Sequence, residues 1–401
     1  MKVIRKIIIT FFALLLLCAS AFAEEKKIET SGYIRSFLIF TNSENDDSTE
    51  LLSRLRLRLF IPKEDNISWE FAYELLPRLR QDAAIVSISA NPQLIYRAFD
   101  LDELVYPGSA DSGSDLALYQ NLDRANVTFA TDHFDVFIGR QALAFGSARV
   151  INPTDIIAPF TYNTIAKEEL TGVDAIRIKT PFMEMGEIDM GVVSGHEFKP
   201  EESAAFIRSR SYIKKTDVSV MAMVFKENVL IGLDIARAIK GAGVWLEAAQ
   251  VFANAAESYR PDENYFRLSA GADYSFTEKL YGYIEYHYSG AGSGRSGDYF
   301  SPINKTAFRE GAVYLLGRHY IAPGFSYQIT PLLLFSGSAL INLNDGSALL
   351  SPVFEYSIVQ DIYANLGAYI GSGDSSDNML KPESEFGLYP DTYYAALNFY
   401  F

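Results

Sequence analysis

The sequence is poor in cysteine and histidine, which limits the chemistry open to the protein. Its one cysteine, Cys18, lies in the first 23 residues, and its four histidines are scattered over separate segments. No Gly-x-Ser-x-Gly, HExxH or phosphate-loop motif is present. We therefore expect no disulfide, no metal site, no cofactor and no enzymatic activity. The one pair with catalytic potential is His287 with Glu285.

The sequence also lacks long hydrophobic runs beyond its N-terminal segment and lacks an excess of positive charge. After residue 23 no segment offers ~18 consecutive apolar residues, which excludes crossing a membrane as a helix there. The chain has 50 acidic and 35 basic residues, a net charge of −15, so nucleic acid is not an expected partner. Tyrosine (25) and phenylalanine (28) are abundant, which suits a large soluble β protein or an outer-membrane barrel.

Residues 1–23 have the pattern of a cleaved secretory signal peptide. Lys2, Arg5 and Lys6 precede an apolar run at 7–17, and Ala-Phe-Ala at 21–23 supplies a small-x-small cleavage site. The run is shorter than the ~20 residues of a membrane-spanning helix. The expected mature chain, 24–401, is one domain, and losing three basic residues takes its net charge from −15 to −18.

The mature chain breaks into alternating stretches that predict about eighteen β-strands, with sixteen as the near alternative. They lie near residues 29–40, 50–62, 66–79, 122–131, 134–145, 172–181, 185–195, 203–214, 217–227, 229–239, 242–253, 264–276, 279–289, 316–329, 331–342, 347–358, 360–371 and 390–401. Most have about ten to thirteen residues, which suits a strand tilted across a bilayer (~9–11) better than a soluble strand (~5–6).

The connections between these strands alternate between short and long. Even-numbered connections are short turns such as 215–216 and 277–278, whereas most odd-numbered ones are long and polar, such as 80–121 and 290–315. Two odd-numbered connections are short. Outer-membrane barrels have short turns at one rim and long loops at the other, whereas a soluble sandwich has no reason to sort its loops in this way.

The alternation of apolar and polar residues continues to the last residue. Tyr393, Ala395, Leu397, Phe399 and Phe401 share one face of the final strand. This resembles the C-terminal signature of Gram-negative outer-membrane barrels, which implies that the barrel-assembly machinery recognises Phe401. Together with the signal peptide and the strand pattern, it makes the chain similar to a porin: an all-β, transmembrane antiparallel β-barrel in the outer membrane.

Residues 139–180 interrupt the strand pattern. About thirty of them have no clean period of 2 or 3.6 and carry turn residues instead. Phe145, Ile156 and Phe160 make the stretch too apolar for a free linker. Because long irregular inserts between strands are usually functional or disordered, we expect a loop that folds inward and narrows the barrel.

The same stretch carries a spaced motif. It consists of Gly139-Arg140-Gln141, Gly146, Asn152-Pro153-Thr154-Asp155 and Gly172-Val173-Asp174-Ala175. The motif resembles a group of largely uncharacterised porin-like outer-membrane proteins, some of which resemble alginate-export channels of similar strand number. Those proteins often carry Trp before the second glycine, where this chain has Phe145. Asn152-Pro153-Thr154-Asp155 is also an ordinary turn sequence.

Alternation places several charged side chains on the lumen wall. The arginines of the segment Arg54-Leu55-Arg56-Leu57-Arg58 project inward, because a charge on the lipid face costs roughly 2–4 kcal/mol at mid-bilayer. The predicted pore-lining residues are Arg54, Arg56, Arg58, Glu70, Glu74, Arg140, Arg177, Lys179 and Arg267, and the predicted constriction-loop residues are Arg149, Asn152, Asp155, Lys167 and Glu168. Two interpretations stay open: a lattice of paired charges, or unpaired arginines that favour anions, with opposed loop charges setting a transverse field.

These features predict a porin for passive diffusion of small polar solutes, with a preference for anions. The alternatives are a substrate-specific (poly)saccharide or organic-acid channel, and a closed barrel that acts through its extracellular loops as an adhesin or scaffold. The expected partners are outer-membrane lipid and lipopolysaccharide, the solutes and the barrel-assembly machinery. The sequence leaves the choice between a monomer and a homo-oligomer open.

Overall fold

The computed structural model describes residues 28–42, 47–64, 66–81, 96–101, 103–107, 115–159, 169–255, 264–374 and 382–401. The predicted signal peptide lies outside these ranges, as do Lys167 and Glu168 of the predicted constriction loop. Among the described residues, no helix has the length and apolar character needed to cross a membrane.

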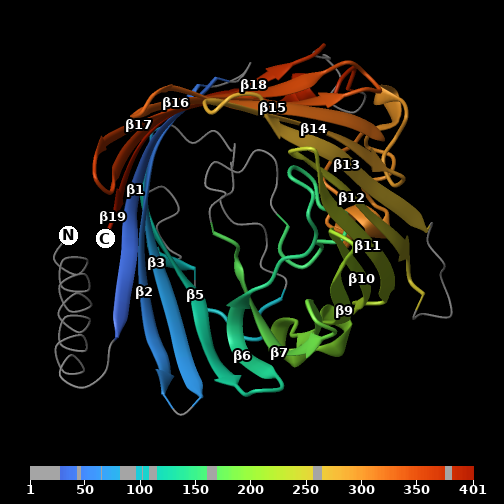
Figure 1. The fold of residues 1–401 in the computed structure, drawn as a ribbon. Coiled ribbons are helices and arrows are strands. Elements are labelled where there is room, and N and C mark those ends of the chain that lie inside the picture. The colour runs from blue at the N-terminus through green and yellow to red at the C-terminus, as the bar shows by residue number, and fades with distance from the viewer. Residues whose placement is uncertain are drawn as a thin grey trace.

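The described chain is almost entirely β-structure (Figure 1). Its strands are Glu29–Asn42 (β1), Ser48–Glu64 (β2), Ile67–Gln81 (β3), Leu104–Tyr106 (β4), Leu116–Ala130 (β5), Asp135–Ala142 (β6), Gly172–Phe182 (β7), Gly186–Val193 (β8), Ala204–Ile213 (β9), Thr216–Phe225 (β10), Asn228–Ile239 (β11), Ala242–Phe252 (β12), Tyr265–Ser275 (β13), Leu280–Ser289 (β14), His319–Thr330 (β15), Leu333–Asn342 (β16), Ala348–Val359 (β17), Ile362–Ser372 (β18) and Asp391–Tyr400 (β19). Short helical turns occur at His196–Phe198 (η1), Pro200–Glu202 (η2), Ser296–Asp298 (η3), Thr306–Arg309 (α2) and Phe386–Leu388 (η4).

Eighteen of these strands form one closed antiparallel barrel. The ring closes at β1, whose Tyr33 faces Arg56 of β2 on one side and Tyr400 of β19 on the other. The three-residue strand β4 pairs only with β5 and stands outside the ring, because β3 pairs directly with β5. Each predicted strand therefore has a counterpart, and β4 is the one strand that the sequence pattern did not indicate.

Strand length varies around the barrel. Strands β2, β3 and β5 have 17, 15 and 15 residues, whereas β6 and β8 have eight each. The predicted strand 134–145 was too long, since the chain leaves the wall after Ala142 and buries Leu143 and Phe145 inside the barrel. The wall is therefore short on the side of β6 and β8.

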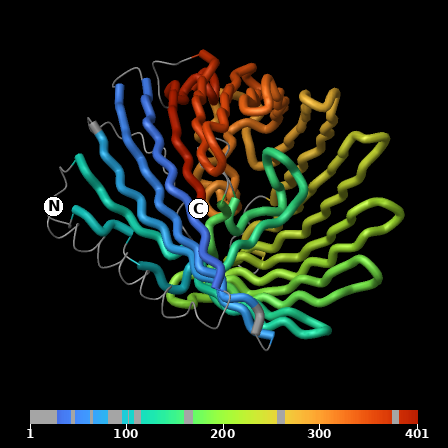
Figure 2. The backbone as a smooth tube through the Cα atoms, turned by 60° about the vertical axis from the view of Figure 1, so that its left-hand side comes forward, coloured from blue at the N-terminus to red at the C-terminus, as the bar shows by residue number. Residues whose placement is uncertain are grey.

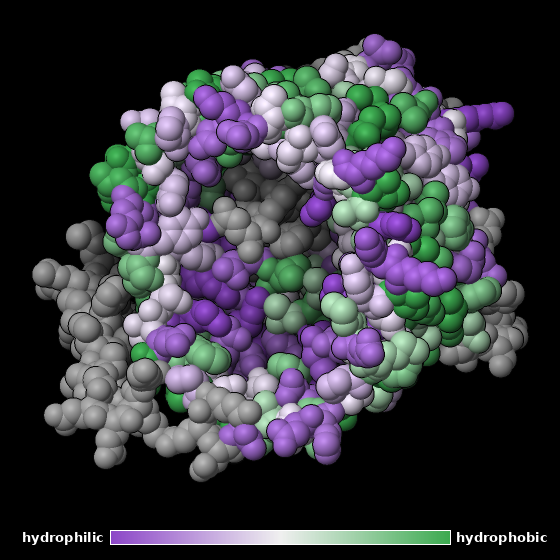
Figure 3. All heavy atoms as spheres, in the orientation of Figure 1, coloured by the Kyte–Doolittle hydropathy of each residue, from purple (hydrophilic) through white to green (hydrophobic). Residues whose placement is uncertain are grey.

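The two faces of the wall differ in polarity as the alternation predicted. Leu366 and Leu397, on the outer face of β18 and β19, are 61% and 51% exposed, while Asn398 on the inner face is buried. Hydrophilic side chains gather on the inner wall that is visible in Figure 3. An apolar exterior around a polar interior is the pattern of a barrel that crosses a bilayer.

Residues 143–159, here called the inner loop, fold back into the barrel (Figures 1 and 2). Their apolar side chains Leu143, Phe145, Ile156 and Ile157 share a buried cluster with inward-facing residues such as Phe206 of β9. The rings of Phe145 and Phe206 meet edge to face at 5.0 Å. This packing explains why the stretch is apolar although it is irregular, and it confirms the inward-folded loop.

Candidate functional site

One carboxylate of β12 holds the inner loop against the wall. Glu247 accepts hydrogen bonds from the backbone N–H groups of Ser147 and Ala148, both at 3.1 Å, and of Thr154 at 2.8 Å. The Thr154 hydroxyl at 2.7 Å and the Asn152 side-chain amide at 3.1 Å donate to the same group. Glu247 is fully buried. Its charge is therefore met by loop dipoles, through charge-assisted hydrogen bonds.

A second buried carboxylate, two strands further around, holds the middle of the same loop. Glu285 of β14 accepts hydrogen bonds from the backbone N–H groups of Arg149 at 2.7 Å, Val150 at 3.3 Å and Ile151 at 2.9 Å. The indole N–H of Trp245 also donates to Glu285, at 2.9 Å. The two carboxylates thus bind six backbone N–H groups of the inner loop, and we call Glu247 and Glu285 the loop anchors.

The second glycine of the motif is required by the first loop anchor. Gly146 has φ +89°, a left-handed conformation that side chains rarely adopt, and an added Cβ would lie 2.2 Å from the Glu247 carboxylate. Asn152 and Thr154 of the same motif donate to that carboxylate directly. The motif therefore encodes the docking of the loop, which is more than the ordinary turn that its sequence also suggests.

Asp155 was predicted in the constriction loop and Arg267 on the pore wall, and the structure buries both side chains. Asp155 is 6% exposed and lies beneath the loop, where burial and then the neighbouring Glu247 raise its pKa to about 7. Arg267 of β13 is 3% exposed, and its guanidinium approaches the carbonyl oxygens of Pro153 at 3.4 Å and Gly311 at 3.5 Å. The loop covers both side chains, which could not be foreseen from strand alternation.

His287, the histidine with catalytic potential in the sequence, also supports the inner loop. Nδ1 of His287 lies 2.9 Å from the hydroxyl of Ser269, which donates to the carbonyl oxygen of Ile151 at 2.6 Å. Both side chains are buried, and the neighbouring Glu285 is occupied by the loop N–H groups. His287 and Glu285 therefore support the inner loop from the same strand through separate contacts, His287 by way of Ser269 and Glu285 directly.

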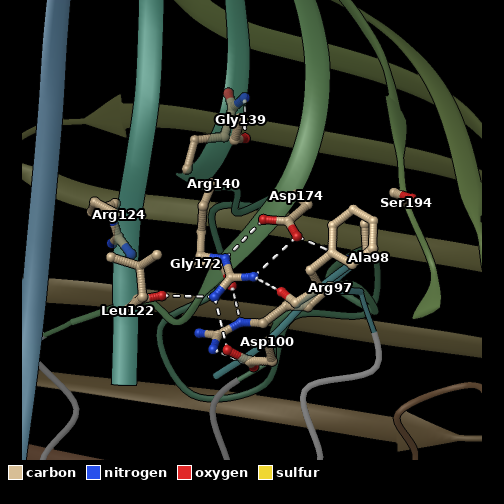
Figure 4. A network of polar contacts seen from close by, with 12 residues as sticks. Arg97, Ala98, Asp100, Leu122, Arg124, Gly139, Arg140, Gly172, Asp174 and Ser194 are labelled. Atoms are coloured by element: carbon tan, nitrogen blue, oxygen red, sulfur yellow. Dashed lines mark hydrogen bonds and ion pairs between the residues drawn. The ribbon is translucent and has the colours of Figure 1, made fainter. Parts of the chain in front are cut away.

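The outer ends of the motif form a clamp on residues 96–101, here called the rim segment (Figure 4). Arg140 at the end of β6 pairs with Asp174 of β7 at 2.8 Å and with Asp100 at 3.0 Å. Its guanidinium also donates to the carbonyl oxygens of Phe99 and Leu122. Arg140 was predicted to line the pore, and in the structure its guanidinium holds the rim segment instead.

The rim segment is also tied to β7 by one of its backbone N–H groups and by the Arg97 side chain. The Asp174 carboxylate accepts the N–H of Ala98 at 2.9 Å, and Arg97 donates to the carbonyl oxygen of Gly172 at 3.0 Å. A Cβ on Gly172 would lie 1.9 Å from the carbonyl oxygen of Asp123, so the strand start tolerates only glycine. The residues Arg140, Gly172 and Asp174 of the motif thus join β5, β7 and the rim segment.

The arginines of β2 share the inner face of the wall, and two of the three are ion-paired. Arg56 is 4% exposed and contacts Glu74 at 2.8 Å and Asp123 at 2.5 Å. Arg58 contacts Glu70 at 2.7 Å, and its side chain is 44% exposed. The lattice of paired charges therefore describes these residues, and Glu70 and Glu74 occupy the predicted places.

Arg54 differs from its two neighbours on the strand. It is 8% exposed, and within the described ranges no carboxylate lies at ion-pair distance from it. It faces Arg35 of β1 across the strand pair, so two guanidinium groups are adjacent on the wall. Arg35 stacks over the ring of Tyr33 at 4.1 Å and donates to the hydroxyl of Tyr400 at 2.8 Å. Arg54 therefore gives this part of the wall a positive charge that no described carboxylate contacts.

The remaining predicted cations are paired. Arg177 makes two hydrogen bonds to Asp189, at 2.7 and 2.6 Å, and Lys179 lies 3.3 Å from Glu187. Arg149 of the inner loop has a side chain that is 56% exposed and pairs with Asp273 of β13 at 2.9 Å. Of these three, only Arg149 presents its side chain on the exposed surface of the loop.

The loop anchors are the functional residues that sequence reasoning missed. A usable signal existed, because Glu247 is the only charged residue of β12 and Glu285 the only acidic residue of β14. A lone carboxylate in an apolar or aromatic strand must find strong donors when it is buried. Among the described residues, no group of three or more His, Cys, Asp or Glu side chains is arranged to hold a metal ion.

Comparison with known proteins supports the architecture. No protein-family model and no curated protein sequence matches the chain. Solved structures do match: OccK8 (OprE) of Pseudomonas aeruginosa has a TM-score of 0.59 and 8% identity over 94% of this chain and 98% of its own. OccAB4 of Acinetobacter baumannii has 0.58 and 10% over 94% and 99%, and P. aeruginosa OccK2 (OpdF), solved in complex with glucuronate, has 0.56 and 9% over 93% and 98%. The chain therefore has the closed 18-stranded barrel fold of the Occ/OprD outer-membrane porins.

Proposed function

We propose that the protein is an outer-membrane porin through which small polar solutes diffuse passively, with a preference for anions. Three properties support the porin: the closed antiparallel barrel, its apolar outer face and the inner loop docked inside it. In such barrels the polar inner face conducts and the apolar outer face meets lipid. The export signal predicted at 1–23 is consistent with this location.

The preference for anions rests on one observation, the position of the buried Arg54 on the inner wall. Arg54 adds a positive charge that no described carboxylate offsets, whereas Arg56 and Arg58 are matched by acidic partners. Charge of one sign on a low-dielectric wall raises the local concentration of counter-ions.

Uptake into proteoliposomes tests this function with two solutes that share a ring and differ in charge. Glucuronate and glucose are compared at low ionic strength, and empty liposomes give the background. We expect faster uptake of glucuronate, and we expect the difference to shrink at high salt because the attraction is screened. Equal or faster uptake of glucose would contradict the anion preference and favour a saccharide channel. No uptake of either solute by folded, inserted barrels would favour a closed barrel that acts through its loops.

A further inference from the structure

An apolar groove of about 660 Å³ opens on the outside of the barrel, under the rim that carries the long connections. Its floor consists of residues from five neighbouring strands, and the rim segment and the turns η1 and η2 form its roof. The floor residues are Ile138, Ile176, Val192, Ala205 and Val224. A volume of this size falls in the range of sites that enclose one small ligand, ~300–1,000 Å³.

The floor of the groove belongs to the outer face of the wall. Ile176 and Val192 are 56% and 57% exposed, while their strand neighbours Ala175 and Val193 are buried toward the interior. The groove is therefore continuous with the apolar outer band of the barrel. In a bilayer this surface faces hydrocarbon, where an unfilled apolar hollow loses dispersion contacts.

The roof is held in place by the clamp that the motif forms. Phe99 of the rim segment meets Phe198 of η1 edge to face at 5.2 Å, and both rings are more than 60% exposed. The backbone bond from Glu197 to Ala98, at 2.9 Å, joins η1 to the rim segment. Arg140, paired with Asp174 and Asp100, fixes the rim segment that carries Phe99 (Figure 4 shows the clamp).

We propose that this groove binds one acyl chain of lipid A, the phosphorylated lipid of the outer leaflet, with Lys226 contacting its phosphate. Lys226 lines the groove at the turn between β10 and β11, at the rim side. In the described part of the chain, no carboxylate lies at ion-pair distance from it. The groove is apolar along its length and ends at the ammonium group of Lys226, at the level of the rim. This arrangement matches a hydrocarbon chain that ends in an anionic headgroup.

The inference rests on the proposed membrane location, and its test separates the two. The occupant is argued to be lipid because the groove is a roofed trough whose floor continues the lipid-facing band. A second copy of the chain would have to insert a projecting ridge beneath Phe99 and Phe198. That occupant is treated as an outcome of the experiment.

The experiment is a titration of the purified barrel with hexa-acyl diphosphoryl lipid A, followed by native mass spectrometry. Ala205→Trp places an indole in the groove, and Ala222→Trp places the same ring on the outer face of β10, outside the groove. Lys226→Gln removes the proposed phosphate contact, and Lys240→Gln is its control at the opposite end of β11. The folded state of each variant is checked by its resistance to denaturation in detergent.

We expect the wild type to retain one lipid A molecule. Ala205→Trp should weaken retention by about tenfold because the groove is overfilled, while Ala222→Trp should change it within about twofold. Lys226→Gln should weaken retention about fivefold and Lys240→Gln should leave it unchanged. Equal retention by the two tryptophan variants overturns the proposal. So does a wild-type oligomer that Ala205→Trp dissociates, because the groove would then hold a second copy.

Conductance is measured on the same preparations. Lipid retention without conductance would overturn the proposed porin function and leave the groove assignment standing. Conductance without selective lipid retention would overturn the groove assignment and leave the porin function standing. Because the groove lies outside the barrel wall, Ala205→Trp should leave the conductance at its wild-type value.

Discussion

The two inner walls of the barrel use buried charge in opposite ways. On β2, β3 and β5 a buried guanidinium meets carboxylates from neighbouring strands, as Arg56 meets Glu74 and Asp123. On β12 and β14 the buried carboxylates Glu247 and Glu285 instead accept the backbone N–H groups of the inner loop. We call the first the paired wall and the second the anchoring wall.

The difference shows that inward orientation alone does not assign a role to a charged residue. On the paired wall, ion pairs crosslink strands and leave excess charge only where a partner is lacking, at Arg54. On the anchoring wall, the two carboxylates hold the irregular inner loop. The N–H groups of this loop form no strand hydrogen bonds, and they need another acceptor because they are buried. The paired wall contributes the unmatched charge of Arg54 to the lumen, and the anchoring wall shapes the lumen by holding the inner loop.

The largest expected effect comes from removing the buried ion pairs at the centre of the paired wall. Arg56→Ala leaves the buried Glu74 without its cation and Asp123 with Arg124 alone, and should lower the free energy of unfolding by about 3 kcal/mol. Arg58→Ala removes a half-exposed pair from the same strand and should cost at most about 1 kcal/mol. Urea unfolding of the barrel in lipid vesicles measures both. Equal losses would show that burial of the pair is not what distinguishes them.

The next effect detaches the loop from the anchoring wall. Glu247→Ala removes the acceptor of three backbone N–H groups and two side-chain donors, and should weaken loop docking by about 3 kcal/mol or more. Single-channel current noise and protease sensitivity within 143–159 should rise. The control Glu355→Ala removes an inner-wall carboxylate that binds only Asn365 in the described contacts. A noisy Glu355→Ala channel would point to a general loss of barrel rigidity.

A smaller effect comes from pH, through Asp155 beneath the loop. Its pKa, raised to about 7, means that the docked loop favours the protonated acid. This contribution is complete below the ordinary pKa of an aspartate and is lost as pH rises through about 7, by about 1 kcal/mol between pH 6 and 8. Wild-type channel noise should therefore rise over that interval, and Asp155→Asn should reduce the dependence. An unchanged pH dependence in Asp155→Asn would assign it to another group.

Most of the fold was predictable because two periodic signals agree over the whole chain. Strand alternation and the sorting of connections by length both follow from crossing a bilayer, and they predicted eighteen strands. The strand at 134–145 was predicted too long because Leu143 and Phe145 continue its apolar pattern while packing inside the barrel. Periodicity cannot distinguish a residue that faces lipid from one that a folded-back loop buries.

The sequence indicated which face of the wall the charged side chains occupy, but it indicated fewer of their contacts. Glu74 and Arg56 were expected side by side, since cross-strand neighbours follow from register, and they pair. The cover over Arg267, and the two carboxylates that pair with Arg140, come from segments more than thirty residues away in sequence. No local pattern carries such information, although the isolated acid at Glu247 is a signal that could have been used.

The reversal potential in a planar bilayer under a tenfold KCl gradient tests the central claim most directly. The paired wall is predicted to leave Arg54 as an unmatched cation, so the potential should lie toward the chloride equilibrium potential. Arg54→Gln should move it toward zero, and Arg58→Lys, which keeps the charge beside Glu70, should leave it in place. A wild-type potential toward the potassium equilibrium potential would contradict the account.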